Sequence, residues 1–177
     1  GAMFLAGLLA HAAGATVFCT STVNGFGRFR PNALAPQSVL WGRDNRGALL
    51  RVVGSGRDLR IENRLGEPLA NPYLAIASQI WAGLDGMARR LEPPPATDAP
   101  YAAGAALLPL RRAGKRIGLV PTLAEALDAL AASSVLHQGL GEPMAQVFHA
   151  IKRQELARHA QAEDAALWER REYFGRS

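Results

Sequence analysis

Apolar and polar residues alternate along three short stretches, and the alternation is cleanest between residues 59 and 65. One face of an extended strand there carries Leu59, Ile61 and Leu65. The opposite face carries Arg60, Glu62 and Arg64. Asp44-Asn45 and Gly54-Ser55-Gly56 provide turn residues between the stretches. The pattern predicts a small antiparallel sheet with one solvated face, built from residues 37–43, 47–53 and 59–65.

Apolar residues at helical spacing dominate the rest of the chain. Asn71 and Pro72 predict the start of a long helix, and Thr122 with Glu125 forms a capping box that begins another. The other predicted helices are residues 3–13, 143–159 and 163–174, and a short strand is predicted at 16–20. The apolar side of the long helix is predicted to be Leu74, Ile80, Trp81, Leu84 and Met87. The expected fold class is α+β, a small antiparallel sheet packed with helices.

The connections and the tryptophans complete this picture. Four prolines between residues 92 and 100 indicate an exposed linker. Residues 101–120 are ambiguous, with a possible short strand followed by a basic turn. The three tryptophans lie on apolar faces and are expected in the core: Trp41, Trp81 and Trp168.

Composition narrows the class of protein. A chain of 177 residues with 49% apolar content is expected to form one compact unit. Eight arginines and three acidic residues lie between Arg28 and Arg64, while the whole chain has two lysines. The guanidinium group binds carboxylate and phosphate through two parallel hydrogen bonds. The arginines therefore favour a site for small anions, with a basic surface stripe as the alternative.

Cysteine content and the N-terminal segment bear on localisation. Cys19 is the single cysteine, so an intrachain disulfide is impossible and a reducing compartment is the simplest interpretation. The apolar segment 4–18 lacks a basic start, contains His11 and is too short to span a bilayer. We expect a cytoplasmic protein that does not contact a membrane. Residues 1–3, Gly-Ala-Met, are interpreted as a cloning scar.

Several motifs together resemble the glutamine synthetase family. Asn24-Gly25-Phe26-Gly27-Arg28-Phe29 is similar to its Asn-Ser-Tyr-Lys-Arg-Leu segment, and Pro31 and Ala35-Pro36 match the loop that follows. Residues 41–51 resemble its Ser-x-Arg-Asn-Arg-Ser-Ala-x-x-Arg stretch. Arg60-x-Glu62-x-Arg64 leads into Asn71-Pro72-Tyr73-Leu74 in the same way as in the family. Residues 121–127 and 168–173 resemble its closing helices, so the resemblance covers residues 4–174.

This resemblance implies the C-terminal part of a catalytic domain, here residues 4–177. The implied activity is an ATP-dependent ligase that joins glutamate to ammonia or an organic amine, with Mg²⁺ or Mn²⁺ as cofactor. Glu62 corresponds to a metal ligand, Arg28 and Arg64 to arginines that hold glutamate. The implied ATP-binding residues are Arg46, Arg51 and Arg60. The complete enzyme is expected to be a homo-oligomeric ring. This part alone is expected to be inactive, to expose apolar surface where the rest of the catalytic sheet should pack, and to self-associate to cover it.

The chain departs from the family pattern at several positions. Leu34 stands where the family has a loop glutamate that attracts ammonium and takes its proton, which favours a bulkier amine or a weakened site. Glu67 stands where aspartate is usual, and Asp44 replaces an arginine. Two alternatives stay open: a non-catalytic module that binds anions or nucleic acid, and a pseudoenzyme that assembles with a partner. The scarcity of lysine and the lack of a basic helix disfavour nucleic-acid binding.

Overall fold

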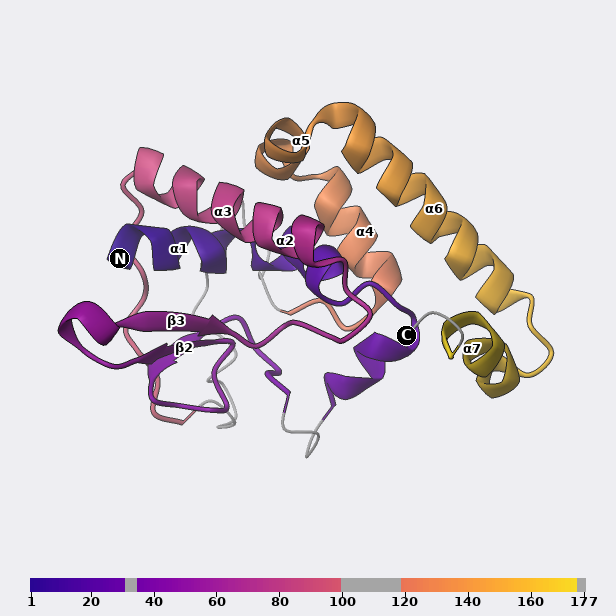
Figure 1. The fold of residues 1–177 in the computed structure, drawn as a ribbon, viewed down its shortest axis with the longest axis horizontal. Helices are drawn as coiled ribbons and strands as arrows, with labels where there is room; N and C mark the ends of the chain where they lie inside the picture. Colours follow the sequence, from indigo (N-terminus) through magenta and orange to yellow (C-terminus); the bar gives the residue numbers. More distant parts are fainter. Residues whose placement is uncertain (31–34, 100–118, 175–177) are drawn as a thin grey trace.

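A computed structural model describes residues 1–30, 35–99 and 119–174 of the chain. A small sheet lies beneath two packed helices, and a second group of helices continues to the other end of the molecule (Figure 1). The first half contains α1 (Ala2–Ala10), α2 (Ala12–Cys19), the 3₁₀ helix η1 (Asn24–Arg28), β1 (Trp41–Arg43), β2 (Leu50–Val53), the 3₁₀ helix η2 (Gly56–Asp58) and β3 (Arg60–Asn63). The second half contains α3 (Pro72–Ala88), α4 (Leu123–Ala131), α5 (Ser134–Leu140), α6 (Glu142–Ala160) and α7 (Ala165–Tyr173).

The sheet is mixed, so the prediction that it is antiparallel throughout is wrong for one of its two strand pairs. The strand order is β1-β2-β3; β2 and β3 are antiparallel, whereas β1 and β2 are parallel. Asp44 turns the chain at a φ of 46°, and Ala48 and Leu49 then pass through the core with no exposed surface. Because this apolar connection is buried, β2 begins with Leu50 beside Trp41 and runs parallel to β1. A tight hairpin would have made the two strands antiparallel.

Residues 16–20 belong largely to helix α2, so the predicted short strand there is wrong. Nearly every residue of α2 is buried, and the hydroxyl of Thr16 donates to the Ala12 carbonyl at 2.7 Å. Packing on all sides outweighs the strand preference of Thr16 and Val17. The predicted helix 3–13 is divided, because α1 and α2 are bent by 79° at their junction.

Helix α3 packs on α1 through small residues. A Cβ atom on Gly86 would lie 2.6 Å from the Gly7 Cα and 2.3 Å from the Met3 carbonyl oxygen, so the two backbones touch. The predicted apolar side of α3 is therefore exposed at Ile80, Trp81, Leu84 and Met87, whereas Leu74 is partly buried against the second core cluster. The exposed large residues of α3 are Tyr73, Ile76, Ile80, Trp81, Leu84 and Met87. The chain thus exposes large apolar side chains on α3, while apolar surface where the rest of the catalytic sheet would pack stays a prediction.

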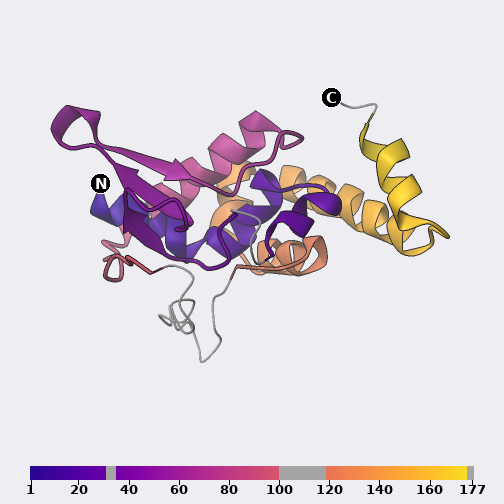
Figure 2. The ribbon, with the colours of Figure 1, turned by 90° about the horizontal axis from the view of Figure 1, so that it is seen from below.

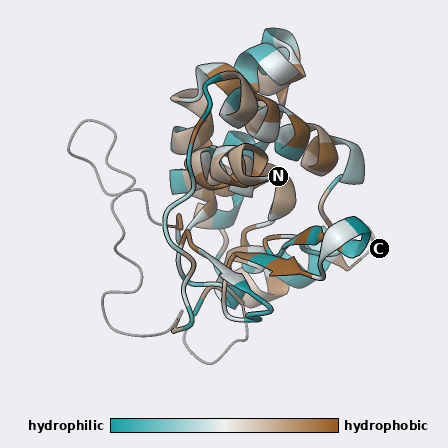
Figure 3. Ribbon diagram, turned by 90° about the vertical axis from the view of Figure 1, so that its left-hand side faces the viewer, coloured by the Kyte–Doolittle hydropathy of each residue, from teal (hydrophilic) through white to brown (hydrophobic). Residues whose placement is uncertain are grey.

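The buried residues form two clusters. One lies between α1, α3 and the sheet and includes Leu9, Leu49 and Leu65; the other lies around α2 and α4 and includes Phe18 and Leu127. Hydrophobic stretches lie on the helices as well as on the strands (Figure 3). The prediction of buried tryptophans is wrong for Trp81, which is 42% exposed, and Trp41 and Trp168 are half-buried. Trp81 lies over Gly139 at the surface of α5.

The predicted helix starts are confirmed. The Asn71 side chain accepts hydrogen bonds from the amides of Tyr73 and Leu74, and the Thr122 side chain accepts from the amide of Glu125. α6 and α7 lie at the predicted positions, and α7 stands beyond the end of α6 (Figure 2). The proline-rich segment is irregular, but it is anchored rather than free: the Trp41 indole donates to the Pro94 carbonyl at 2.7 Å. Residues 100–118, including most of the ambiguous segment, lie outside the described residues.

Among the described residues, no single helix is long and apolar enough to cross a membrane. The bent pair α1 and α2 meets the length and composition criteria together, and most of its residues are buried in the core.

A hydrogen bond between the side chains of His11 and Asp85 joins the α1–α2 junction to α3. The two side chains are 2.7 Å apart, and Arg89 Nη1 donates to the same carboxylate at 3.0 Å. Burial pushes the pKa of Asp85 upward, but the hydrogen bonds from His11 and Arg89 outweigh it, so the pKa lies below its ordinary value. Ionised Asp85 therefore stabilises the fold above the unfolded-state pKa of about 4, and this contribution is lost as pH falls through the lower folded-state pKa.

We expect Asp85→Asn to lower the free energy of unfolding by about 1–2 kcal/mol at pH 7 and to have less effect near pH 3. Urea denaturation at a series of pH values measures this difference. Asp58→Asn, at an exposed aspartate, is the control. A cost for Asp85→Asn that is the same at both pH values would contradict a stabilising role for ionised Asp85.

Candidate functional site

The pairing of β2 with β3 brings together three of the residues that the sequence singled out. Arg51 lies opposite Glu62 in the ladder, and its Nη1 donates to Glu62 Oε2 at 2.9 Å. Arg60 Nε lies 3.5 Å from Glu62 Oε1. Arg51 also pairs with Asp44, which follows β1. We call Arg51, Glu62, Arg60 and Asp44 the strand charge cluster.

Hydrogen bonds within this cluster shift the pKa values of its members. The hydrogen bond from Arg51 is the main reason that the pKa of Glu62 lies below its usual range, so Glu62 is ionised at neutral pH. Hydrogen bonds to Asp44 and then to Glu62 raise the pKa of Arg51 further. The Nε of Arg51 is buried and has no hydrogen-bond partner among the described residues.

Arg28 and Arg64 are also brought together. Arg28 Nη1 donates to the Leu65 carbonyl at 3.0 Å and to the carbonyl of Gly66, and its Nη2 is 3.4 Å from the Arg64 carbonyl. Burial lowers the pKa of Arg28, Glu67 raises it and Arg64 lowers it. The Arg28 guanidinium is therefore held against the backbone where β3 ends, close enough to Arg64 for the two charges to interact.

Three contacts that the sequence did not indicate fix the segment that carries Arg28. Glu67 accepts from the amides of Ser21 and Thr22 at 2.6 and 2.9 Å. The amide of Val23 donates to the Tyr173 hydroxyl at 3.0 Å, across 150 residues of sequence. That hydroxyl in turn donates to Glu155 at 2.6 Å. The only sequence signal for these residues was the family likeness of residues 168–173 and the departure at Glu67.

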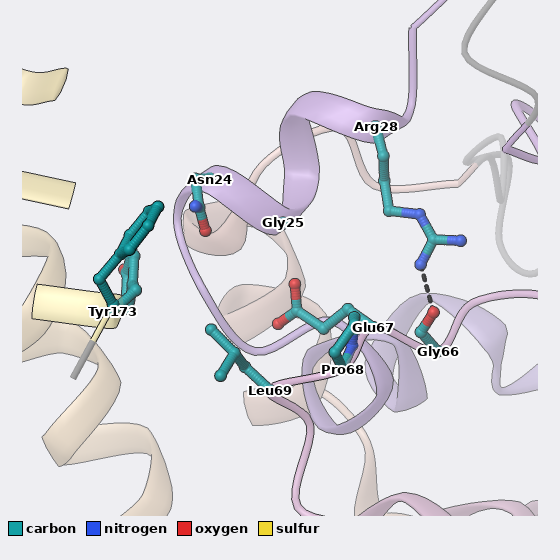
Figure 4. A pocket seen from close by; sticks show the side chains of 9 residues that line it. Asn24, Gly25, Arg28, Gly66, Glu67, Pro68, Leu69 and Tyr173 are labelled. Carbon is teal, nitrogen blue, oxygen red and sulfur yellow. Dashed lines mark hydrogen bonds between the residues drawn. The ribbon is translucent and has the colours of Figure 1, made fainter. Parts of the chain in front are cut away.

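A pocket of about 550 Å³ opens between η1, the segment after β3 and the C-terminal end of α7 (Figure 4). Arg28 and Asn24 form one wall, while Tyr173 stands across from Glu67 and Leu69. The lining residues are Asn24, Gly25, Arg28, Gly66, Glu67, Pro68, Leu69, Tyr173 and Phe174. The pocket therefore combines one cation and one carboxylate with apolar and aromatic surface.

Two predicted site residues are not part of these groups. Arg46 is exposed in the connection between β1 and β2. Leu34 lies outside the described residues. The described contacts consequently join Arg51 and Arg60 of the proposed nucleotide-binding set, without Arg46.

The described residues do not form a divalent-cation site by themselves. Mg²⁺ and Mn²⁺ prefer several oxygen ligands, and Glu62 is already held by two arginines. No group of three or more His, Cys, Asp or Glu side chains in the described part of the chain could hold a metal ion. A metal at Glu62 would therefore need ligands from elsewhere.

Comparisons with known proteins identify the family of the chain. The family model "Glutamine synthetase, catalytic domain" matches residues 1–173. Gamma-glutamylanilide synthase of an Acinetobacter species is 40% identical over 98% of this chain and 35% of its own length. Gamma-glutamylethanolamide synthetase of Streptomyces coelicolor is 38% identical over 98% of this chain and 35% of its own length. Glutamine synthetase of Thermus thermophilus is 38% identical over 86% of this chain and 34% of its own length.

A solved structure of GmaS bound to ADP superimposes with a TM-score of 0.77 at 32% identity, covering 98% of this chain and 39% of the GmaS chain. The chain carries a glutamine-synthetase-type fold and belongs to the glutamine synthetase family. It spans about a third of the length of the curated relatives that it matches.

Proposed function

We propose that this chain is the C-terminal part of the catalytic domain of an ATP-dependent ligase that joins the γ-carboxyl group of glutamate to an amine. The observation that carries the proposal is the pairing of Arg51 and Arg60 with Glu62 along one strand pair, together with the contact of the Arg28 guanidinium with the backbone at the end of β3. The arginine groups correspond to the glutamate-binding and nucleotide-binding sets that the family resemblance implies.

The proposed reaction has two steps. A γ-carboxylate oxygen of glutamate attacks the γ-phosphorus of ATP, so that γ-glutamyl phosphate forms and ADP leaves. The amine nitrogen then attacks the γ-carbonyl carbon, phosphate leaves, and the nitrogen loses a proton. Arg51 and Arg60 would balance the charge on the transferred phosphoryl group, and Arg28 and Arg64 would hold glutamate. The remaining groups, including further ligands for Mg²⁺ or Mn²⁺, would come from the rest of the complete ligase and from neighbouring subunits.

We infer that the amine is organic rather than ammonia. Two relatives bear names that specify an anilide and an ethanolamide as products. Leu34 supports the same conclusion, because an apolar side chain neither attracts ammonium nor takes its proton. It does provide surface against which an amine could bury methylene groups, at about 0.8 kcal/mol for each.

In the complete ligase, we expect kcat/KM to be higher for an organic primary amine such as ethylamine than for ammonia, and Leu34→Glu to shift the ratio toward ammonia about tenfold. Competition assays with both amines at saturating ATP and glutamate measure the ratio. Leu34→Gln, of similar length but without charge, is the matched control and should not favour ammonia. A tenfold preference of the unmodified enzyme for ammonia would contradict the inference.

A further inference from the structure

Two departures from the family pattern meet in space. The family motif has serine where this chain has Gly25, and usually aspartate where it has Glu67. The Glu67 carboxylate accepts hydrogen bonds from the amides of Ser21 and Thr22 and from the Thr22 hydroxyl at 3.0 Å. It thereby holds the start of the segment that leads through Gly25 to Arg28.

Gly25 leaves the space that the Glu67 side chain fills. A Cβ atom on Gly25 would lie 1.8 Å from Glu67 Oε2, 2.7 Å from its Cδ and 2.8 Å from the Thr22 hydroxyl oxygen. A glutamate terminus can often swing aside, but this one is held by two backbone amides. Gly27 in the same 3₁₀ helix is different, because a Cβ atom there would meet nothing within 4 Å.

Arg28 contacts the residues immediately before Glu67. Glu67 directly follows Leu65 and Gly66, whose carbonyls accept from the Arg28 guanidinium. The amide of Glu67 donates to the Cys19 carbonyl at 2.9 Å, so the backbone of residue 67 is fixed as well as its side chain. The segments 19–28 and 64–67 therefore lie against each other and are linked twice, by the hydrogen bonds of Glu67 and by those of Arg28.

We propose that Glu67 is a positioning residue for Arg28. Because glycine at position 25 leaves the space that the Glu67 side chain fills, the residues at positions 25 and 67 are coupled. The role in substrate binding rests on the proposed function, whereas the coupling does not. Aspartate at position 67 would retract the carboxylate by about 1.5 Å, one C–C bond, and free the volume that a serine at position 25 needs. Gly25→Ser alone would create a steric clash with Glu67, and Glu67→Asp alone would leave the space beside Gly25 unfilled. The two substitutions together would fit each other.

The coupling is tested on the 177-residue chain with Gly25→Ser, Glu67→Asp, the double variant and Gly27→Ser as the matched control. Amide-resolved hydrogen exchange is followed at Ser21 and Thr22, together with the Tm. We expect Gly25→Ser to accelerate exchange at these amides at least tenfold and to lower the Tm by about 4–8 °C. Glu67→Asp should have a smaller effect of the same sign. The double variant should return to within threefold of the original exchange rates, and Gly27→Ser should not differ. A double variant as perturbed as the sum of the single variants would overturn the coupling.

The positioning role is tested in the complete ligase. Gly25→Ser is expected to raise the KM for glutamate at least tenfold with little change in the KM for ATP, and the double variant to restore it. An equal rise in both KM values, or an unchanged KM for glutamate in a variant whose exchange is accelerated, would overturn the role. Absence of γ-glutamyl transfer in the unmodified ligase would refute the proposed function, while the exchange measurements would still decide the coupling.

Discussion

Replacing Glu155 by alanine is expected to lower the free energy of unfolding of this chain by about 3–5 kcal/mol. Glu155 is 2% exposed, and its two carboxylate oxygens bind Lys152 Nζ at 2.7 Å and the Tyr173 hydroxyl at 2.6 Å. Truncation would leave the largely buried ammonium of Lys152 without its counter-charge and the phenol without its acceptor. Urea denaturation followed by circular dichroism measures the loss.

The neighbouring Gln154→Ala is the matched control, because Gln154 is exposed on the same turn of α6 and its truncation should cost less than about 0.5 kcal/mol. Burial, and then the hydrogen bond to Glu155, raises the pKa of Tyr173 far above neutral pH, so the phenol stays protonated and able to donate. The double variant Lys152→Met with Glu155→Leu should recover part of the stability, since no unpaired charge is left. A cost below about 1 kcal/mol for Glu155→Ala would mean that water replaces the carboxylate.

The elements that could be predicted from sequence are those set by local chemistry. The helix starts at Asn71 and Thr122 were predictable because one side chain satisfies the first amides of its own helix. The alternation at residues 59–65 likewise predicted β3 and the arginines and glutamate that its side presents. The parallel pairing of β1 with β2 was not predictable, because it depends on burying Ala48 and Leu49 in a core formed by distant helices.

The long helix α3 illustrates the same limit. Large apolar residues recur along α3 at helical spacing, yet the residues of α3 that are buried are small. Gly7 and Gly86 allow the backbones of α1 and α3 to touch, which leaves no space for large side chains between them. Periodicity alone cannot show which of two apolar sides of a helix faces the core. Large apolar residues of α3 are exposed, and both the expected apolar surface beside the missing sheet and self-association stay predictions.

The roles of the candidate-site residues stay predictions, and most of their contacts could not be derived from the sequence. Family motifs indicated Arg28, Arg51, Arg60, Glu62 and Arg64, and strand pairing explains why Arg51 meets Glu62. The tie between Val23 and Tyr173 joins residues at opposite ends of the chain, and no local pattern encodes it. Asp44, which the sequence indicated as a turn residue at a position where the family has arginine, is a second carboxylate partner of Arg51.

Glu62→Gln in the complete ligase is expected to lower kcat about 100-fold or more and to raise the Mg²⁺ concentration needed for half-maximal activity. Glutamine keeps the shape of the side chain but has one neutral oxygen, a poorer ligand for a hard cation. It also leaves Arg51 and Arg60 without the carboxylate that they share. Steady-state assays over a Mg²⁺ titration measure both quantities.

Asp44→Asn is the matched control, because it removes the other carboxylate partner of Arg51 and leaves Glu62 in place. If Glu62 served only to hold Arg51, the two variants would lose similar activity and neither would change the Mg²⁺ requirement. We expect instead a loss of less than about tenfold for Asp44→Asn with an unchanged Mg²⁺ requirement, since Glu62 alone still orients the Arg51 guanidinium at 2.9 Å. A shifted Mg²⁺ requirement only in Glu62→Gln would assign Glu62 to metal binding and Asp44 to the orientation of Arg51.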